Sequence, residues 1–330
     1  MPIPYDASDA ALFHPEQPFH PLPQPRGTPP PGPWPNGIVL GAECARLAYL
    51  QVELPSSAQG ALLNQQLQRF GFGSATAFAP EGCSTQGFGA YRAADGCAVL
   101  ALRGTQADQL MDVVQDARAL MVPLRPEDGM GQGQVHDGFL AGARSVVQAM
   151  RTWLNSLPQP ATQVLVCGHS LGAAIATLLA LPLGAHHLVT IGSPRVGNQA
   201  FADGLSAKAG LTIDRLVDSA DIVTMVPPGD SQARMAGLIT AVSAAVSWLP
   251  GHADDPLTRL LTLAGASLDY RHVGRRHYID RDGLLHADAS DSAISADRLG
   301  DGLQLKTRLL HDHAPINYLR ALWPDEFPAG

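Results

Sequence analysis

The stretch from Val164 to Ala176 constrains the fold of this 330-residue chain more than any other. A short apolar run rich in β-branched residues ends at Gly168, Ser170 stands between two glycines, and a run of small residues follows at once. A Gly-x-Ser-x-Gly segment of this kind is typical of a strand that turns sharply into a helix and holds the serine hydroxyl at the edge of a sheet. Glycine is expected at 168 and 172 because the turn leaves no room for Cβ atoms beside the serine.

Strands and helices are predicted to alternate on both sides of this turn. The predicted order is an amphipathic helix over 136–157, a strand over 164–167, a helix over 171–181, a strand over 187–191, a helix over 198–207 and a strand over 213–218. Strands that alternate with helices in this way form parallel sheets with helices on both faces. The sequence therefore predicts an α/β fold.

The flanking regions give weaker patterns. Residues 1–36 are rich in proline, so we expect an N-terminal arm that runs extended and forms no helix. The remainder, 37–330, is expected to form one domain, in which 231–268 is a helical insertion or a cap over the site. The other predicted elements are helices over 38–54, 58–70 and 315–323, a hairpin of 88–92 with 97–103 around Asp95-Gly96, and a late hairpin of 278–280 with 284–286.

Composition excludes several classes of function. The formal charge is −8 and there is no basic run, which argues against nucleic acid and against electrostatic docking on anionic lipid. The longest apolar stretch, Ala236 to Leu249, is too short to span a bilayer, so no transmembrane segment is expected. No basic segment followed by an apolar core is seen at the start, so no signal peptide is expected, and both a cytoplasmic location and leaderless secretion stay open. The four cysteines lack metal-ligand spacing, and a bridge between Cys83 and Cys97 stays open.

A serine hydroxyl is a weak nucleophile and needs a base, an orienting acid and donors for the oxyanion. The helix that begins at Leu171 points its amide groups at such an oxyanion. Asp221 and Asp218, at the end of the last predicted strand, are the rival acids. Six later histidines compete as the base: His252, His272, His277, His286, His311 and His313. The last two are favoured because they precede the final predicted helix in a loop that can return to the sheet.

Four motifs occur in an order that resembles the fungal-type class 3 lipase family over about 85–325. They are Arg103-Gly104-Thr105, Val135-His136-Asp137-Gly138-Phe139, Gly168-His169-Ser170-Leu171-Gly172-Ala173 and Gly192-Ser193-Pro194-Arg195-Val196-Gly197-Asn198. The resemblance implies an α/β-hydrolase fold that cleaves carboxylic esters with neither a metal nor an organic cofactor.

The same resemblance assigns roles to individual residues. It implies Ser170 as nucleophile, Asp221 as acid and His313 as base, with His311 as the second choice. The oxyanion donors would be Thr105 and the backbone amide of Leu171. One departure is that Pro227 lies farther from the acid than the family's Asn-Asp-x-Val-Pro pattern places its proline.

These assignments predict a lipase that acts on acylglycerol esters through an acyl-enzyme. A lid is expected over 106–120 or in the insertion around 236–263, opening at a lipid–water interface. The alternatives are a soluble esterase on short acyl, feruloyl or polyester substrates, a phospholipase, and a non-catalytic protein that binds a hydrophobic ligand. His169 is expected to support the serine turn by hydrogen bonding, and His136 to make structural bonds at the start of its helix.

Overall fold

The computed structural model describes residues 3, 5–13, 37–50, 58–104, 120–219, 221–227, 269–287, 289–290, 293–294 and 311–326. Expectations for Thr105, for the lid over 106–120 apart from Leu120, for the 231–268 insertion and for His252 lie outside these residues. Among the described residues, no helix is both long enough and apolar enough to cross a membrane.

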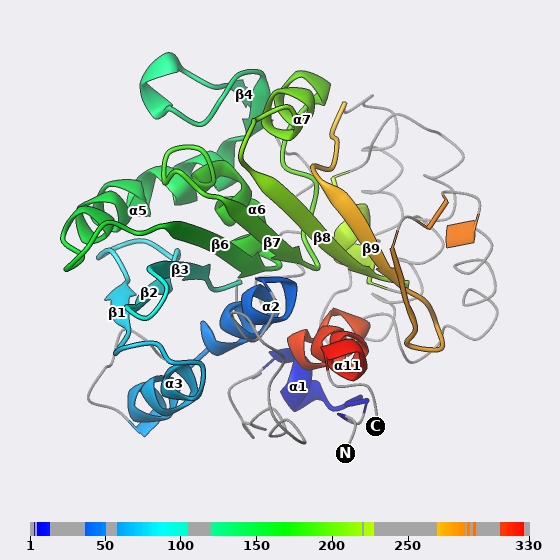
Figure 1. The fold of residues 1–330 in the computed structure, drawn as a ribbon. Coiled ribbons are helices and arrows are strands. Elements are labelled where there is room, and N and C mark those ends of the chain that lie inside the picture. Colours follow the sequence, from blue (N-terminus) through cyan, green and yellow to red (C-terminus); the bar gives the residue numbers. More distant parts are fainter. Residues whose placement is uncertain are drawn as a thin grey trace.

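One mixed sheet forms the centre of the described structure (Figure 1). Its strand order is β1-β2-β3-β6-β7-β8-β9-β10. The strands are β1 (Thr76–Phe78), β2 (Gly87–Arg92), β3 (Cys97–Leu102), β6 (Gln163–His169), β7 (His187–Ile191), β8 (Thr212–Asp218), β9 (Arg275–Ile279) and β10 (Leu285–Ala287). Strands β3, β6, β7, β8 and β9 pair in parallel, while β1, β2 and β10 pair antiparallel at the two edges. The predicted α/β class with a mostly parallel sheet is confirmed.

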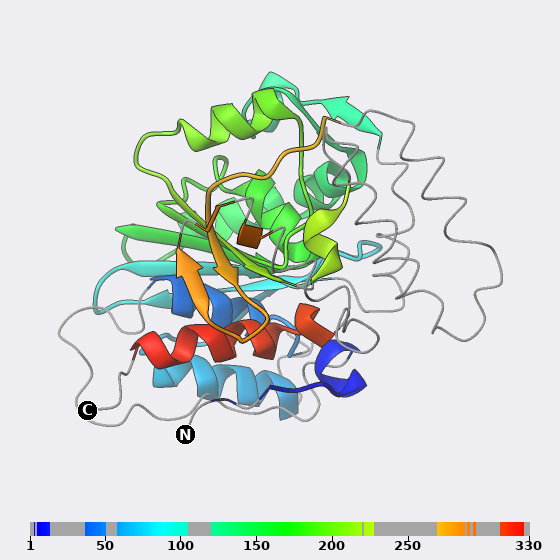
Figure 2. The same cartoon turned by 90° about the vertical axis from the view of Figure 1, so that its right-hand side faces the viewer.

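Helices cover both faces of the sheet (Figures 1 and 2). One face carries α5 (Asp137–Asn155), α6 (Leu171–Leu179) and α7 (Gln199–Ser206), and the other carries α1 (Asp9–Phe13), α2 (Gly37–Leu47), α3 (Ala58–Arg69) and α11 (Pro315–Glu326). A small hairpin of β4 (Met121–Pro123) and β5 (Gln134–His136) precedes α5. Short 3₁₀ turns occur at η1 (Pro126–Asp128), η2 (Ile222–Met225) and η3 (His311–His313).

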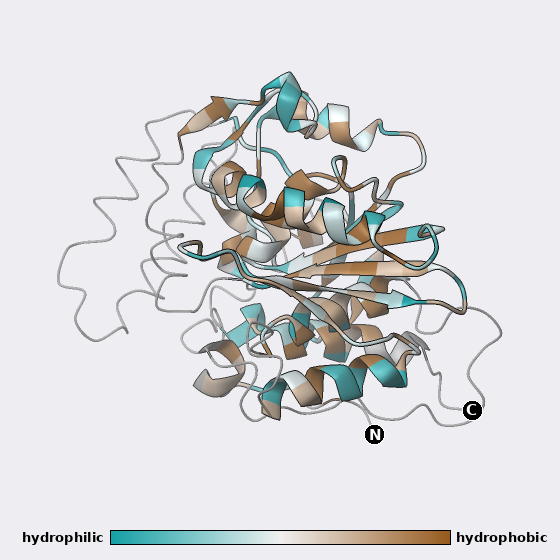
Figure 3. Ribbon diagram, turned by 90° about the vertical axis from the view of Figure 1, so that its left-hand side faces the viewer, coloured by the Kyte–Doolittle hydropathy of each residue, from teal (hydrophilic) through white to brown (hydrophobic). Residues whose placement is uncertain are grey.

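The apolar core lies on both sides of the sheet, and apolar colouring in Figure 3 is concentrated on the strands and on the helix faces turned toward them. On the α5–α6 face, Phe139, Val146 and Met150 are buried, as the amphipathic pattern predicts. On the opposite face α2 is buried along almost its whole length, and Gly41 lies so close to β7 that a Cβ would be 2.6 Å from Cβ of Val189. This close packing places α2 directly beneath the strands that carry the site.

The predicted alternation over 136–218 is confirmed, with element ends shifted by a few residues. Two other expectations are wrong. The helix expected over 38–54 ends at Leu47, because the chain turns through Tyr49 and Leu50, whose amides bond to carbonyls three residues back. The proline-rich arm does form a helix, α1, because residues 5–13 contain no proline and Ser8 accepts a hydrogen bond from the amide of Ala11.

The late hairpin is confirmed, but its first strand begins at Arg275 rather than Tyr278 and joins the main sheet parallel to β8. The open question about Cys83 and Cys97 is answered by two free thiols, the first exposed and the second buried.

Candidate active site

Ser170 occupies the sharp turn between β6 and α6. Its φ of 56° is the only positive value of a non-glycine residue in the described chain. A Cβ at Gly168 would lie 2.4 Å from the carbonyl oxygen of Gly172, and a Cβ at Gly172 would lie 2.4 Å from that of Leu102. Both glycines are therefore required by space, as the sequence predicts, and the strained serine backbone costs about 1–3 kcal/mol, which the surrounding packing has to offset.

The turn is held by contacts with the ends of the neighbouring strands. The amide of Ser170 donates to the carbonyl of Ile191 at the end of β7, 2.9 Å away. Gly104, after β3, lies against the serine, because a Cβ there would be 3.0 Å from Cβ of Ser170. The ends of β3, β6 and β7 thus meet at the serine, at the edge of the sheet where the parallel strands end.

Asp221 and His313 are brought together from segments 92 residues apart. Nδ1 of His313 lies 2.7 Å from Oδ2 of Asp221, and both side chains are almost fully buried. Since the carboxylate accepts, a neutral imidazole here has its proton on Nδ1 and its lone pair on Nε2. Gly192 permits this contact, because a Cβ there would be 2.8 Å from Oδ2 of Asp221 and 3.0 Å from two atoms of the imidazole.

The carboxylate of Asp221 has further donors. Oδ1 accepts from the amide of Val223 at 2.9 Å, which makes Asp221 the N-cap of η2. Oδ2 also accepts from the hydroxyl of Tyr318 on α11 at 2.5 Å. Burial and then the charge of Asp221 raise the pKa of Tyr318 well above its usual value, so the phenol remains a donor.

His169 links the serine turn to His313. Its Nε2 lies 2.7 Å from the backbone oxygen of His313, its Nδ1 lies 2.7 Å from the hydroxyl of Tyr49, and the two imidazole centroids are 4.5 Å apart. Burial, and then the neighbouring imidazole of His313, lower the pKa of His169 well below its usual value, so its ring is neutral. Because a carbonyl can only accept, Nε2 donates and Tyr49 donates to Nδ1. His169 is hydrogen-bonded as expected, but its partners are Tyr49 and His313 rather than atoms of the serine turn.

Two buried atoms of this group have no hydrogen-bond partner in the described structure, Oγ of Ser170 and Nε2 of His313. One is a donor and the other, in the tautomer set by Asp221, is an acceptor. The two residues are linked through His169, which directly precedes Ser170 in the chain and whose Nε2 lies 2.7 Å from the backbone oxygen of His313. A hydroxyl and an unprotonated imidazole nitrogen, both buried and both unpaired, are the two groups that a proton transfer from serine requires.

The other sequence candidates have different positions. The amide of Asp218 binds the hydroxyl of Tyr318. His272 contacts the backbone oxygen of Thr224, His277 binds Asp214 and His286 binds Asp280. The backbone oxygen of His311 accepts from Asn317. His136 caps α5 by accepting from the amide of Gly138, which confirms its structural role.

Sequence reasoning did not identify Tyr49 or Gly192 as part of this group. Tyr49 occupies one position of an apolar pattern, and nothing near it in the sequence marks its hydroxyl as a partner of His169. The positive φ of Gly192, 57°, and its contact with His313 arise from the tertiary fold. Only the motif that begins at Gly192 gave a signal.

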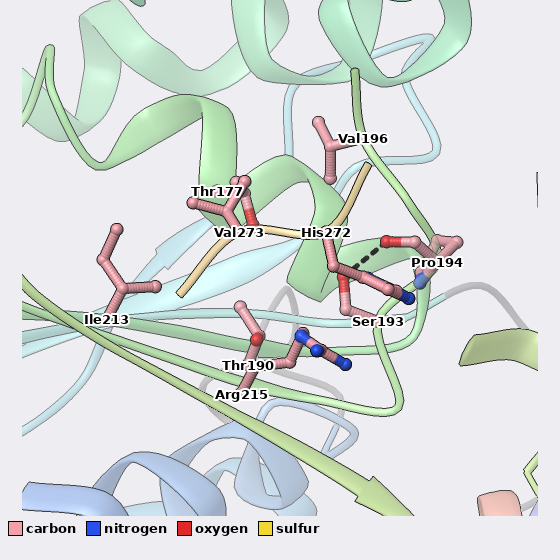
Figure 4. A pocket seen from close by; sticks show the side chains of 9 residues that line it. All are labelled: Thr177, Thr190, Ser193, Pro194, Val196, Ile213, Arg215, His272 and Val273. Atoms are coloured by element: carbon pink, nitrogen blue, oxygen red, sulfur yellow. Dashed lines mark hydrogen bonds between the residues drawn. The ribbon is translucent and has the colours of Figure 1, made fainter. Parts of the chain in front are cut away.

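A small polar cavity lies nearby, on the α6 side of the sheet (Figure 4). Thr177, Thr190, Ser193, Arg215 and His272 supply its polar lining, and the hydroxyl of Ser193 is bonded to the carbonyl of Pro194. The space suffices for about one water molecule, too little for an acyl chain. Within the described residues, no group of three or more His, Cys, Asp or Glu side chains is arranged to hold a metal.

Comparison with known proteins matches residues 99–231 to the family described as lipase (class 3). Phospholipase A(1) DAD1, chloroplastic, of Arabidopsis thaliana is 32% identical over an alignment of 151 residues, and the match covers 39% of this chain and 33% of that protein. The secreted mono- and diacylglycerol lipase MDL2 of Malassezia globosa is 32% identical over an alignment of 142 residues, and the match covers 39% of this chain and 46% of that protein. The chain thus spans less than half the length of these curated relatives.

The fold is similar to that of solved lipases. The crystal structure of lipase from Rhizopus microsporus var. chinensis aligns with a TM-score of 0.53 and 22% identity, covering 84% of this chain and 91% of that one. The sequence match over 99–231 includes Ser170, Gly192 and Asp221, and the structural match covers 84% of the chain. Residues 99–231 thus resemble the class 3 lipase family, and the fold is that of the solved lipases, an α/β-hydrolase fold.

Proposed function

We propose that this protein is a serine hydrolase of carboxylic esters, and that its substrates are acylglycerols. The observation that carries the proposal is the pairing of His313 Nδ1 with buried Asp221, which leaves Nε2 of the neutral ring unprotonated, together with a strained Ser170 whose buried Oγ has no hydrogen-bond partner in the described structure. The family match and the lipase relatives support the ester and lipid class of substrate.

The geometry supports a two-step acyl transfer. Nε2 of His313 takes the proton of Ser170 as Oγ forms a bond to the ester carbonyl carbon, and the imidazolium then gives this proton to the departing alcohol. Water attacks the acyl-enzyme by the same route, so that the acid leaves and the serine is regenerated. Asp221 accepts from Nδ1 and stabilises the imidazolium throughout.

The negative oxygen of the intermediate needs donors near the start of α6. The amide of Leu171, the first residue of that helix, is the proposed donor within the described structure, and the resemblance adds Thr105. Each such donor contributes on the order of 3 kcal/mol to the transition state.

The decisive experiment combines labelling with turnover. Purified protein is treated with a fluorophosphonate, the modified residue is located by mass spectrometry, and hydrolysis of p-nitrophenyl esters is measured in parallel. We expect labelling at Ser170, and Ser170→Ala should lose both labelling and turnover. Unchanged hydrolysis by Ser170→Ala would refute the proposal.

A second candidate substrate class follows from one relative, which is named as a phospholipase A(1). A panel of triacylglycerol, diacylglycerol, phosphatidylcholine and short-chain esters separates the possibilities. Faster hydrolysis of acylglycerols than of phospholipid supports the first proposal. The reverse order favours a phospholipase, and activity confined to soluble short-chain esters favours an esterase.

A further inference from the structure

The start of the chain packs against the turn that presents His313. Ile3, Ala11 and Leu12 are buried, and α1 lies against η3 and α11 (Figure 2). We call residues 3 and 5–13 the N-terminal clasp. Burial of its apolar side chains holds the clasp against the protein, and this places its polar groups beside η3.

Polar contacts connect the clasp to Asp312, which directly precedes His313, and to Asn317 at the start of α11. The hydroxyl of Tyr5 donates to Oδ1 of Asp312 at 2.5 Å, and Asp312 is 6% exposed. Asn317 forms a reciprocal pair with the backbone of Asp6, accepting from its amide at 2.9 Å and donating to its carbonyl at 2.8 Å. Nδ2 of Asn317 also donates to the backbone oxygen of His311 at 2.8 Å.

His313 itself is held by two other residues, neither of which belongs to the clasp. Asp221 binds its Nδ1, and His169 donates to its backbone oxygen. Those two contacts fix one ring nitrogen and one backbone atom, while the turn that carries them is a single three-residue 3₁₀ segment. A short segment of this kind has little internal hydrogen bonding, so its position depends on what contacts its two ends.

We propose that Tyr5 is a positioning residue of the active site, which acts by fixing Asp312 and thereby the imidazole of His313. The inference rests on the proposed function, because it assigns Tyr5 a role in the reaction rather than in stability alone. A displacement of a catalytic group by about 1 Å can cost up to about a hundredfold in rate. A single hydroxyl whose partner is nearly buried is expected to produce a smaller change.

The test variant is Tyr5→Phe, which removes only the hydroxyl and keeps the ring beneath Arg320, whose Cζ is 5.5 Å from its centroid. The matched control is Tyr91→Phe, because the hydroxyl of Tyr91 is buried and has no hydrogen-bond partner in the described structure. We expect Tyr5→Phe to lower kcat and the fluorophosphonate labelling rate together by about 5- to 20-fold, with KM within about twofold. Tyr91→Phe should change none of these.

Asp312 provides a rescue experiment. Asp312→Asn keeps an oxygen that accepts from Tyr5, whereas Asp312→Ala removes it, so the asparagine variant should retain more of kcat than the alanine variant. Adding Tyr5→Phe to Asp312→Ala should bring no further loss, since the shared contact is already absent. Full additivity of the two losses contradicts the proposal.

A readout that does not require turnover separates this proposal from the assignment of the reaction. The ¹⁵N resonances of the His313 ring should shift in Tyr5→Phe and not in Tyr91→Phe. If Tyr5→Phe lowers Tm but leaves kcat and the His313 resonances unchanged, the clasp is purely structural and the proposal is wrong. If Ser170→Ala still hydrolyses esters, the proposed function fails, and the His313 resonances alone still decide whether Tyr5 positions the imidazole.

Discussion

Two aspartates associated with strand β8 bind histidine, and they leave different atoms available. Asp214, near the start of β8, contacts Nε2 of His187 and Nε2 of His277, each at 2.7 Å. Asp221, just after the end of β8, contacts Nδ1 of His313 at 2.7 Å. Both carboxylates are buried, at 6% and 0% exposure, so burial does not distinguish them.

The two groups differ in which imidazole nitrogen contacts the carboxylate and in whether the other nitrogen has a partner. At Asp214 the two imidazoles come from β7 and β9, the strands on either side of β8, and both direct Nε2 into the carboxylate. At Asp221 the imidazole comes from a turn outside the sheet, and its Nε2 has no hydrogen-bond partner among the described residues. A histidine–aspartate contact is therefore compatible with a catalytic pair only where the second imidazole nitrogen remains available to a nucleophile.

The largest expected effect comes from replacing a histidine by glutamine beside each of the two aspartates. His313→Gln should lower kcat/KM by about a thousandfold or more, because the proposed base is lost. His277→Gln should leave kcat/KM within about twofold and lower Tm, because a contact to buried Asp214 is weakened. Steady-state kinetics and thermal unfolding of both variants test this, and loss of activity in folded His277→Gln with none in His313→Gln would reverse the two assignments.

The second expected effect concerns the pH dependence of stability. Burial raises the pKa of Asp214, but hydrogen bonds from His187 and His277 outweigh it, and the pKa lies below that of a free aspartate. A carboxyl with a depressed native pKa stabilises the fold above the unfolded value, about 3.9, and loses this contribution as the pH falls through the native value. Asp214→Asn should therefore reduce the free energy of unfolding by about 1–3 kcal/mol at neutral pH.

Denaturant unfolding between pH 3 and 7 measures this contribution. The gap between Asp214→Asn and the unmodified protein should narrow as the pH falls below about 4. Asp282→Asn, on the exposed turn between β9 and β10, removes the same charge and serves as the control. A gap that is constant over the whole range would show that the charge of Asp214 is not what stabilises this group.

The two groups also differ in how well they can be predicted from the sequence. The pattern around Asp221 was accessible because a motif precedes it and the chain order of serine, acid and base is shared by the fold. The Asp214 group was not predicted, since its partners occupy neighbouring strands whose lateral order a single sequence does not give. The same limit applies to Tyr49 and Tyr5, whose hydroxyls reach His169 and Asp312 only after the chain has folded.

For the fold, strong periodicity gave the elements over 136–218, because parallel strands and amphipathic helices bury continuous apolar faces. Three-residue strands such as β1, β4 and β5 were missed, since a run this short shows no alternation. The helix in the arm was excluded on overall proline content, although residues 5–13 contain no proline. Composition averaged over a long segment concealed a short capped helix.

The smallest expected effect concerns the second side-chain donor of each carboxylate. Asp214 has a second histidine, whereas Asp221 has Tyr318, whose raised pKa keeps it a neutral donor over the range of ordinary assays. Tyr318→Phe should lower kcat by about 3- to 10-fold, because Asp221 retains Val223 and His313 as partners but loses one hydrogen bond to a buried charge. Steady-state kinetics should show KM little changed, and Tyr91→Phe again controls for loss of a phenol. An unchanged kcat in folded Tyr318→Phe would mean that Asp221, unlike Asp214, is fully supported by one side chain and one amide.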